Sequence, residues 1–147
     1  MLLKDERQIQ GRSAGGRDAV ILLADGDGAN RERLASSLRR GGLVVHLVGS
    51  GVEALEAAES EQPDLILLDT RLPDTDGLHA IQELKANSAT ASIPIVALTS
   101  SLLRHERDQC LAAGAVRVLI KPVGIGELLE AVQAYLPSTP PGFTAQP

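Results

Sequence analysis

The chain has 147 residues, a net charge of −5, 44% apolar but only 1% aromatic residues, and a single cysteine. This length suits one domain with a core of its own, and the acidic balance without a basic stripe argues against direct nucleic-acid binding. One cysteine excludes a disulfide framework, and no apolar run approaches the roughly 20 residues that span a bilayer. We therefore expect a soluble, cytoplasmic protein that acts on neither nucleic acid nor membrane.

Short runs of branched aliphatic residues alternate with helical patterns along most of the chain. The runs predict strands, and they are AVILLA (19–24), LVVHLV (43–48), DLILLD (64–69), IPIVAL (93–98) and VRVLI (116–120). Helical spacing predicts helices in the intervals: from Asn30 to Arg40, after Ser50 and ending before Pro63, around Ile81, around Cys110, and from Leu128 to Leu136. Such alternation favours a parallel α/β sheet, because each return crossover needs a helix.

The two ends of the chain lack this alternation. Residues 1–18 mix charges with glycines, and residues 137–147 are rich in proline and show no periodicity. We expect a flexible leader over 1–18, one domain over 19–136 and a C-terminal tail over 137–147.

Polar side chains follow the predicted strands. The carboxyl ends of parallel strands form the ligand crevice of an open α/β sheet. The residues at the five strand ends are Asp25, Gly49-Ser50, Asp69, Thr99-Ser100 and Lys121. Two carboxylates, a hydroxyl and an ammonium at one rim predict a site for a metal ion and an anion.

Three segments carry a specific resemblance. LILLDTRLPDTDG (65–77), IPIVALTS (93–100) and AGAVRVLIKPV (113–123) resemble the corresponding segments of receiver domains of bacterial response regulators. The similarity runs from about Ala19 to about Leu136. It implies a doubly wound, flavodoxin-like (βα)5 fold with a five-stranded parallel sheet in the order 2-1-3-4-5.

The resemblance also implies roles for individual residues. Asp69 would be the phosphoacceptor, Thr99 the switch hydroxyl, and Lys121 the cation that a cis bond to Pro122 aims into the pocket. Asp25, Asp69 and the backbone carbonyl of Arg71 would hold Mg²⁺. This matches the chemistry, because a carboxylate attacks phosphorus only when the charge of the phosphoryl group is neutralised.

Two positions depart from the family pattern. Receivers usually end the first strand with two adjacent acids, but here Gly26 follows Asp25. Two alternatives follow. Either Asp27 reaches the metal as a further candidate ligand, or the affinity of the site for the metal is weakened. Val118 replaces the usual Tyr or Phe three residues before the lysine, which puts the usual transmission of the signal in doubt.

We therefore expect a single-domain response regulator rather than an enzyme, with self-catalysed phosphorylation and dephosphorylation as its only chemistry. Its phosphoryl donor would be a histidine kinase or a histidine phosphotransfer protein, and it would signal through protein contacts. By analogy, Arg104, Arg107, Arg117 and Tyr135 would form the partner face, and homodimerisation is left open.

Other interpretations remain at this stage. One is a degenerate, non-phosphorylated receiver that serves as an interaction module. Another is a haloacid-dehalogenase-like phosphohydrolase, in which Asp25 is the nucleophile and Asp27 the general acid; against it, only Glu127 and Glu130 follow Lys121. Taken singly, Asp69 could cap a turn, Thr99 could cap the next helix, and Lys121 could be a surface lysine.

Overall fold

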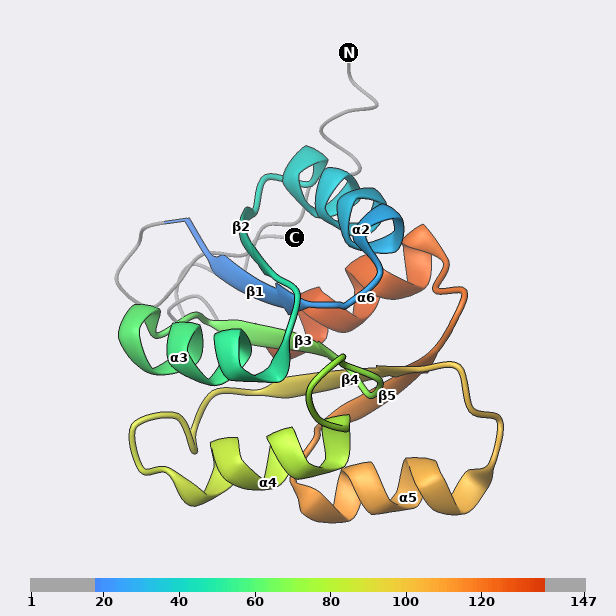
Figure 1. Cartoon of the computed structure of the whole chain (residues 1–147). Helices are drawn as coiled ribbons and strands as arrows, with labels where there is room; N and C mark the ends of the chain where they lie inside the picture. Colours follow the sequence, from blue (N-terminus) through green and yellow to red (C-terminus); the bar gives the residue numbers. More distant parts are fainter. Residues whose placement is uncertain (1–17, 137–147) are drawn as a thin grey trace.

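The computed structural model describes residues 18–136 and consists of alternating strands and helices (Figure 1). The predicted leader 1–18, apart from Asp18, and the predicted tail 137–147 lie outside the described residues. The strands are β1 (Val20–Ala24), β2 (Val44–Val48), β3 (Leu65–Asp69), β4 (Ile95–Thr99) and β5 (Arg117–Ile120). The helices are α2 (Gly28–Arg40), α3 (Gly51–Glu61), α4 (Gly77–Ala86), α5 (Arg104–Ala113) and α6 (Ile125–Tyr135).

All strands pair in parallel in one sheet of order β2-β1-β3-β4-β5, which confirms the predicted topology. Leu23 of β1 is in register with Leu47 of β2 on one side and with Leu67 of β3 on the other. After β2, at one edge of the sheet, the chain therefore passes β1 and continues with β3 on the other side of β1. In doubly wound sheets, ligands bind where the strand order reverses, at the carboxyl ends of the strands. Here that point lies between β1 and β3.

Side chains of successive strand residues enter two separate cores, one on each face of the sheet. Ile21 and Leu23 of β1 pack with α2 and α6, whereas Leu22 and Ala24 pack on the side of α3, α4 and α5. Figure 1 shows the same division of helices between the two faces. Because both faces are covered, the central strands are apolar up to the polar residues at the carboxyl ends of β3 and β4, as expected for a buried parallel sheet.

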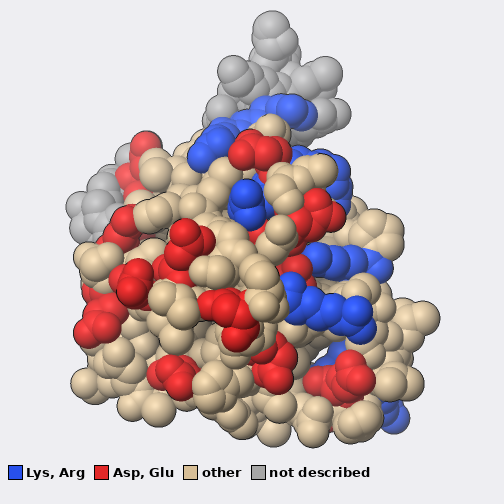
Figure 2. Space-filling view, viewed as in Figure 1, with Lys and Arg blue, Asp and Glu red and all other residues tan. Residues whose placement is uncertain are grey.

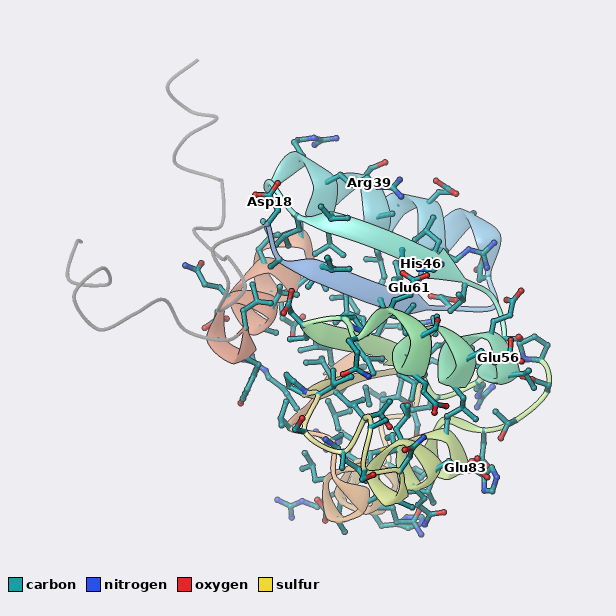
Figure 3. The ribbon with its side chains drawn as sticks, turned by 90° about the vertical axis from the view of Figure 1, so that its left-hand side faces the viewer. Asp18, Arg39, His46, Glu56, Glu61 and Glu83 are labelled. Carbon is teal, nitrogen blue, oxygen red and sulfur yellow. The ribbon has the colours of Figure 1, made fainter. Side chains whose placement is uncertain are left out.

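The edge strand β2 is covered by polar side chains. His46 of β2 and Glu61 of α3 lie face to face, with Nδ1 and Oε1 2.6 Å apart (Figure 3). Arg39 of α2 donates to the carbonyl oxygen of Val45 at 3.0 Å. Charged groups on an edge discourage pairing with another strand.

Helix α5 has the fewest buried residues of the five described helices. Cys110 is its only buried residue, and its N-cap Leu103 offers no side-chain hydrogen bond. In the other four helices three or four residues are buried. A helix with one buried residue loses less apolar burial on a local displacement than a helix with three or four.

Candidate functional site

Four predicted site residues meet at the carboxyl end of the sheet. Asp25 directly follows β1, Asp69 ends β3, Thr99 ends β4 and Lys121 follows β5. The Lys121 N–H donates to the Thr99 carbonyl oxygen at 2.7 Å, and the Lys121–Pro122 peptide bond is cis, as the resemblance implied.

The Lys121 ammonium lies between the two carboxylates. Its Nζ is 2.8 Å from Asp69 Oδ2 and 3.4 Å from Asp25 Oδ2. Asp25 is fully buried and Asp69 is 5% exposed, so neither carboxylate is well hydrated. The alternative of Lys121 as an ordinary surface lysine is wrong, because its ammonium is the counter-ion of a buried acidic pair.

Burial and charge perturb all three groups. Burial raises the pKa of the Asp69 carboxyl above its usual value, and the hydrogen bonds from Lys121 and the Arg71 amide offset only part of that rise. Burial acts on Asp25 in the same sense, but hydrogen bonds from Asp27 and Asn30 and the Lys121 charge leave its pKa lowered. Burial lowers the pKa of Lys121, and its contacts with the two carboxylates outweigh this and raise it. The ammonium therefore stays charged at neutral pH.

Asp25 is held by three neighbours along the chain, of which the sequence interpretation had assigned a role only to Asp27. The side-chain amide of Asn30 donates to Asp25 Oδ2, and the Asp27 N–H donates to Oδ1 at 2.9 Å. The Arg31 guanidinium donates to the Asp25 carbonyl oxygen at 2.6 Å. Asn30 and Arg31 lie in the first turn of α2, five and six residues after Asp25. A polar side chain this close to a strand-end carboxylate, at the start of the next helix, is a sequence signal for such a contact.

The Asp27 side chain has a structural task. Its carboxylate accepts hydrogen bonds from the amides of Ala29 and Asn30 and caps α2, which for this reason begins at Gly28 and not at Asn30. Asp27 is exposed, and the cap directs one of its oxygens toward the helix.

Asp69 and Thr99 are each held in a local turn. Asp69 Oδ1 accepts the Arg71 N–H at 3.0 Å, so it does cap a turn while also contacting Lys121. Thr99 Oγ1 accepts the Ser101 N–H at 3.0 Å. The alternative that Thr99 caps the next helix is wrong, because α5 begins only at Arg104.

The residues present fit a hard divalent cation, with one ligand fewer than usual. Carboxylate and carbonyl oxygens are the ligands that Mg²⁺ prefers, and Asp25, Asp69 and the Arg71 carbonyl would supply them. A Cβ at residue 26 would lie 3.8 Å from the Arg71 carbonyl oxygen and 3.0 Å from Pro73 Cδ. A side chain at Gly26 would therefore start beside this ligand set. Within residues 18–136, no group of three His, Cys, Asp or Glu side chains is placed to hold a metal.

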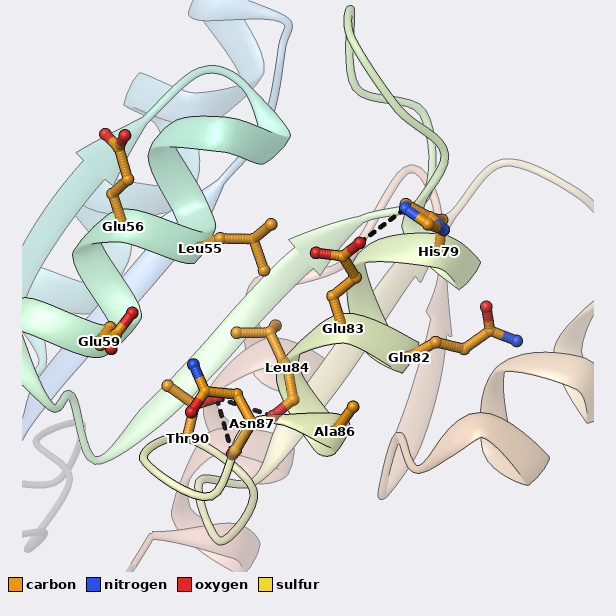
Figure 4. A pocket seen from close by; sticks show the side chains of 10 residues that line it. All are labelled: Leu55, Glu56, Glu59, His79, Gln82, Glu83, Leu84, Ala86, Asn87 and Thr90. Atoms are coloured by element: carbon orange, nitrogen blue, oxygen red, sulfur yellow. Dashed lines mark hydrogen bonds and ion pairs between the residues drawn. The ribbon is translucent and has the colours of Figure 1, made fainter.

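Two further hollows lie away from the strand ends. One of about 550 Å³ lies between α3 and α4; its rim carries Glu56, Glu59 and Glu83, and none of the four site residues lines it (Figure 4). Figure 2 shows acidic side chains gathered over this side of the molecule. The other, of about 400 Å³, lies beside β5 and is lined by three arginines of the predicted partner face and by Val118.

Comparison with known families decides the classification. The model of the response regulator receiver domain matches residues 21–133, which is most of the described chain. The chain belongs to the response regulator receiver family. Receiver domains are signalling phosphoacceptors and not enzymes of the ordinary kind. The predicted family is confirmed.

Relatives and solved structures agree with this membership. The chain is 40% identical over 126 residues to the response regulator MprA of Mycobacterium leprae, covering 86% of this chain and 54% of that protein. This receiver thus spans about half the length of the curated relatives it matches. The receiver domain of the sensor histidine kinase PA1611 of Pseudomonas aeruginosa, with magnesium in its active-site cleft, is 36% identical with a TM-score of 0.75, covering 80% of this chain and 97% of its own.

A second structure extends the comparison to chemotaxis proteins. CheY4 of Vibrio cholerae is 27% identical with a TM-score of 0.76, covering 81% of this chain and 99% of its own.

Among residues 18–136, no helix is long and apolar enough to cross a membrane. The phosphohydrolase alternative finds no support here, because Asp27 caps a helix and Glu127 and Glu130 are exposed on α6.

Proposed function

We propose that this receiver accepts a phosphoryl group on Asp69. The observation that carries the proposal is the position of the Asp69 carboxylate at the end of β3, 2.8 Å from the Lys121 ammonium and beside buried Asp25. A positive charge at this position compensates the charge that a phosphoryl group brings. Thr99, at the end of the neighbouring strand, supplies a hydroxyl donor for a phosphoryl oxygen.

The transfer requires a donor with a labile phosphoryl group, which for this family is a histidine kinase or a histidine phosphotransfer protein. An Asp69 carboxylate oxygen forms the new O–P bond while the P–N bond of the donor phosphohistidine breaks. The departing imidazole keeps the electron pair and takes up a proton. Bound Mg²⁺ would neutralise charge on the phosphoryl oxygens; Asp25, Asp69 and the Arg71 carbonyl would hold it.

The signalling output would be contact with another protein in the cytoplasm. The arginines at positions 104, 107 and 117 surround the hollow beside Val118, which supports this side as the partner face. We propose that the receiver acts as a single domain. The mass of the native protein tests whether an effector domain accompanies it, and the masses of the native and phosphorylated forms distinguish a monomer from a homodimer.

The degenerate receiver is the second candidate function, and Gly26 is the observation that favours it. Without a carboxylate at residue 26, the cation site has two acidic side chains, Asp25 and Asp69. If the remaining ligands bind Mg²⁺ too weakly, the domain would act by protein contact alone.

One experiment separates the two candidates. The protein is incubated with acetyl phosphate and Mg²⁺, and its intact mass is recorded. We expect an adduct of one phosphoryl group that is lost in Asp69→Asn and kept in Asp76→Asn, a control in the same loop whose side chain only caps α4. An adduct that appears only in Gly26→Asp would establish the degenerate receiver, and an adduct that survives Asp69→Asn would refute the proposal.

A further inference from the structure

The loop between β3 and α4, residues 70–76, is attached at its tip to a different helix. Asp74 Oδ1 accepts the Gly51 N–H at 2.7 Å, and Asp74 Oδ2 accepts the Val52 N–H at 3.0 Å. Gly51 and Val52 are the first two residues of α3. One carboxylate therefore joins the loop that follows Asp69 to the start of a helix more than twenty residues earlier in the chain.

This contact is additional to the cap that α3 already has. The Ser50 hydroxyl, at the N-cap, accepts the Glu53 N–H at 3.2 Å. A helix start leaves several amides without partners within the helix, and Asp74 accepts two of those that Ser50 does not reach. These two hydrogen bonds lower the pKa of the Asp74 carboxyl, so it is ionised at neutral pH. The negative charge also suits the positive end of the helix dipole.

The loop tip is seated directly on Gly51. A Cβ at residue 51 would lie 2.2 Å from Thr75 Cγ2 and 3.2 Å from Asp74 Oδ1. Gly51 is not among the described residues with positive φ, so the backbone conformation does not demand glycine there. Space favours it: a Cβ at residue 51 would have to displace the Thr75 side chain, and the loop tip with it where that side chain does not move.

The other end of the same loop carries a candidate metal ligand. The Arg71 N–H donates to Asp69 Oδ1, and Arg71 pairs with Asp76 in an isolated antiparallel bridge. The Leu72 N–H donates to the Thr75 carbonyl oxygen at 3.2 Å, so the two sides of the loop are tied together. A displaced tip would therefore displace the Arg71 carbonyl.

We propose that Asp74 is a positioning residue of the cation site: by fastening the loop tip to the start of α3, it holds the Arg71 carbonyl at the mouth of the site. The inference rests on the proposed function only where it concerns the metal. Asp25 and Asp69 supply the other candidate oxygen ligands, so the Arg71 carbonyl is one of few, and its placement affects the affinity of the site for the cation.

The first test needs no metal and no phosphoryl donor. In Asp74→Ala, amide hydrogen exchange at Leu72 and at Gly77, whose N–H donates to the Thr70 carbonyl oxygen at 2.8 Å, should be about tenfold faster than in the wild type. The matched control is Ser50→Ala, which removes a cap from the same helix without touching the loop. Unchanged exchange in Asp74→Ala, or equal acceleration in both variants, overturns the inference.

The second test measures Mg²⁺ affinity in the Gly26→Asp background, where a third carboxylate is available. Adding Asp74→Ala should weaken binding about tenfold, the usual size for a group that orients a ligand, and adding Ser50→Ala should change it less than about twofold. Gly51→Ala should weaken binding like Asp74→Ala, and Thr75→Ser, which removes the methyl group in the way, should restore it.

These outcomes are separable from the fate of the proposed function. Loss of the Asp69 adduct from the wild type, with loop exchange and Mg²⁺ affinity still dependent on Asp74, would refute phosphorylation and leave the inference standing. Equal Mg²⁺ affinity with and without Asp74 would overturn the inference, whether or not Asp69 is phosphorylated.

Discussion

Replacing Gly26 by aspartate should tighten Mg²⁺ binding, and the geometry shows why. Ligands in an octahedral Mg²⁺ site lie about 2.1 Å from the ion, so neighbouring ligand oxygens are about 3 Å apart. A Cβ at residue 26 would lie 3.8 Å from the Arg71 carbonyl oxygen. A carboxylate carried by that Cβ is therefore within reach of an ion that the Arg71 carbonyl binds.

The gain is offset by one tight contact. The new Cβ would lie 3.0 Å from Pro73 Cδ, and moving the ring by a few tenths of an ångström costs on the order of 1 kcal/mol. Gly26→Asn makes the same contact without the charge and is the matched control. Relative to Gly26→Asn, we expect Gly26→Asp to bind Mg²⁺ about ten- to hundredfold more tightly, which is about 1.4 to 2.8 kcal/mol.

Two measurements check this expectation. Calorimetric titration with Mg²⁺ gives the affinities directly. Urea unfolding without metal should show Gly26→Asp less stable than Gly26→Asn by on the order of 1–3 kcal/mol, because the added charge faces Asp25 and Asp69, and Mg²⁺ should recover that loss by mass action. If Gly26→Asp binds Mg²⁺ no better than Gly26→Asn, the reasoning that residue 26 faces the metal position is refuted.

Three further outcomes are expected. Val118→Tyr should change the free energy of unfolding by less than about 1 kcal/mol in urea titrations, because the hollow beside Val118 has room for the ring; a much larger loss would show that the hollow is closed in solution. Lys121→Met should cost on the order of 3 kcal/mol at pH 7, because it leaves Asp25 and Asp69 together without a cation; the deficit should shrink as the pH falls, because the pKa of Asp69 is raised above its ordinary 3.8 and lets it take up a proton. Asp74→Asn should be less stable than the wild type above about pH 5, and the difference should vanish in acid. The folded-state pKa of Asp74 lies below its ordinary 3.8, so its contribution is lost as the pH falls through that lower value, and a difference that persists at pH 2 would contradict this.

The site departs from the family pattern in a graded way. The ion contacts among Asp25, Asp69 and Lys121 are intact, and Thr99 ends the strand beside them. Only the ligand at residue 26 and the aromatic residue at 118 are replaced. We therefore expect the affinity for metal to be weakened while phosphorylation is retained. We also expect an output in which movement of α5, which has one buried residue, replaces rotation of an aromatic ring.

The sequence by itself determined the architecture. Strands buried on both faces must be aliphatic throughout, and helices between them must carry one apolar side, so the alternation was readable and its parallel order followed from the crossover rule. It also placed Asp25, Asp69, Thr99 and Lys121 at strand ends, because residues that follow a buried strand stand out against the apolar run. These expectations depend on local patterns, which a single sequence displays.

The tertiary structure decided the contacts that join distant segments. No local pattern reveals that Asp74 binds the start of α3, that Gly51 must be small to admit Thr75, or that Gly26 lies beside Pro73 and the Arg71 carbonyl. Each depends on where two loops meet across the end of the sheet. The residues that make up the site could therefore be predicted from the sequence. The geometry that determines the affinity of the site for a cation arises only when those loops are packed together.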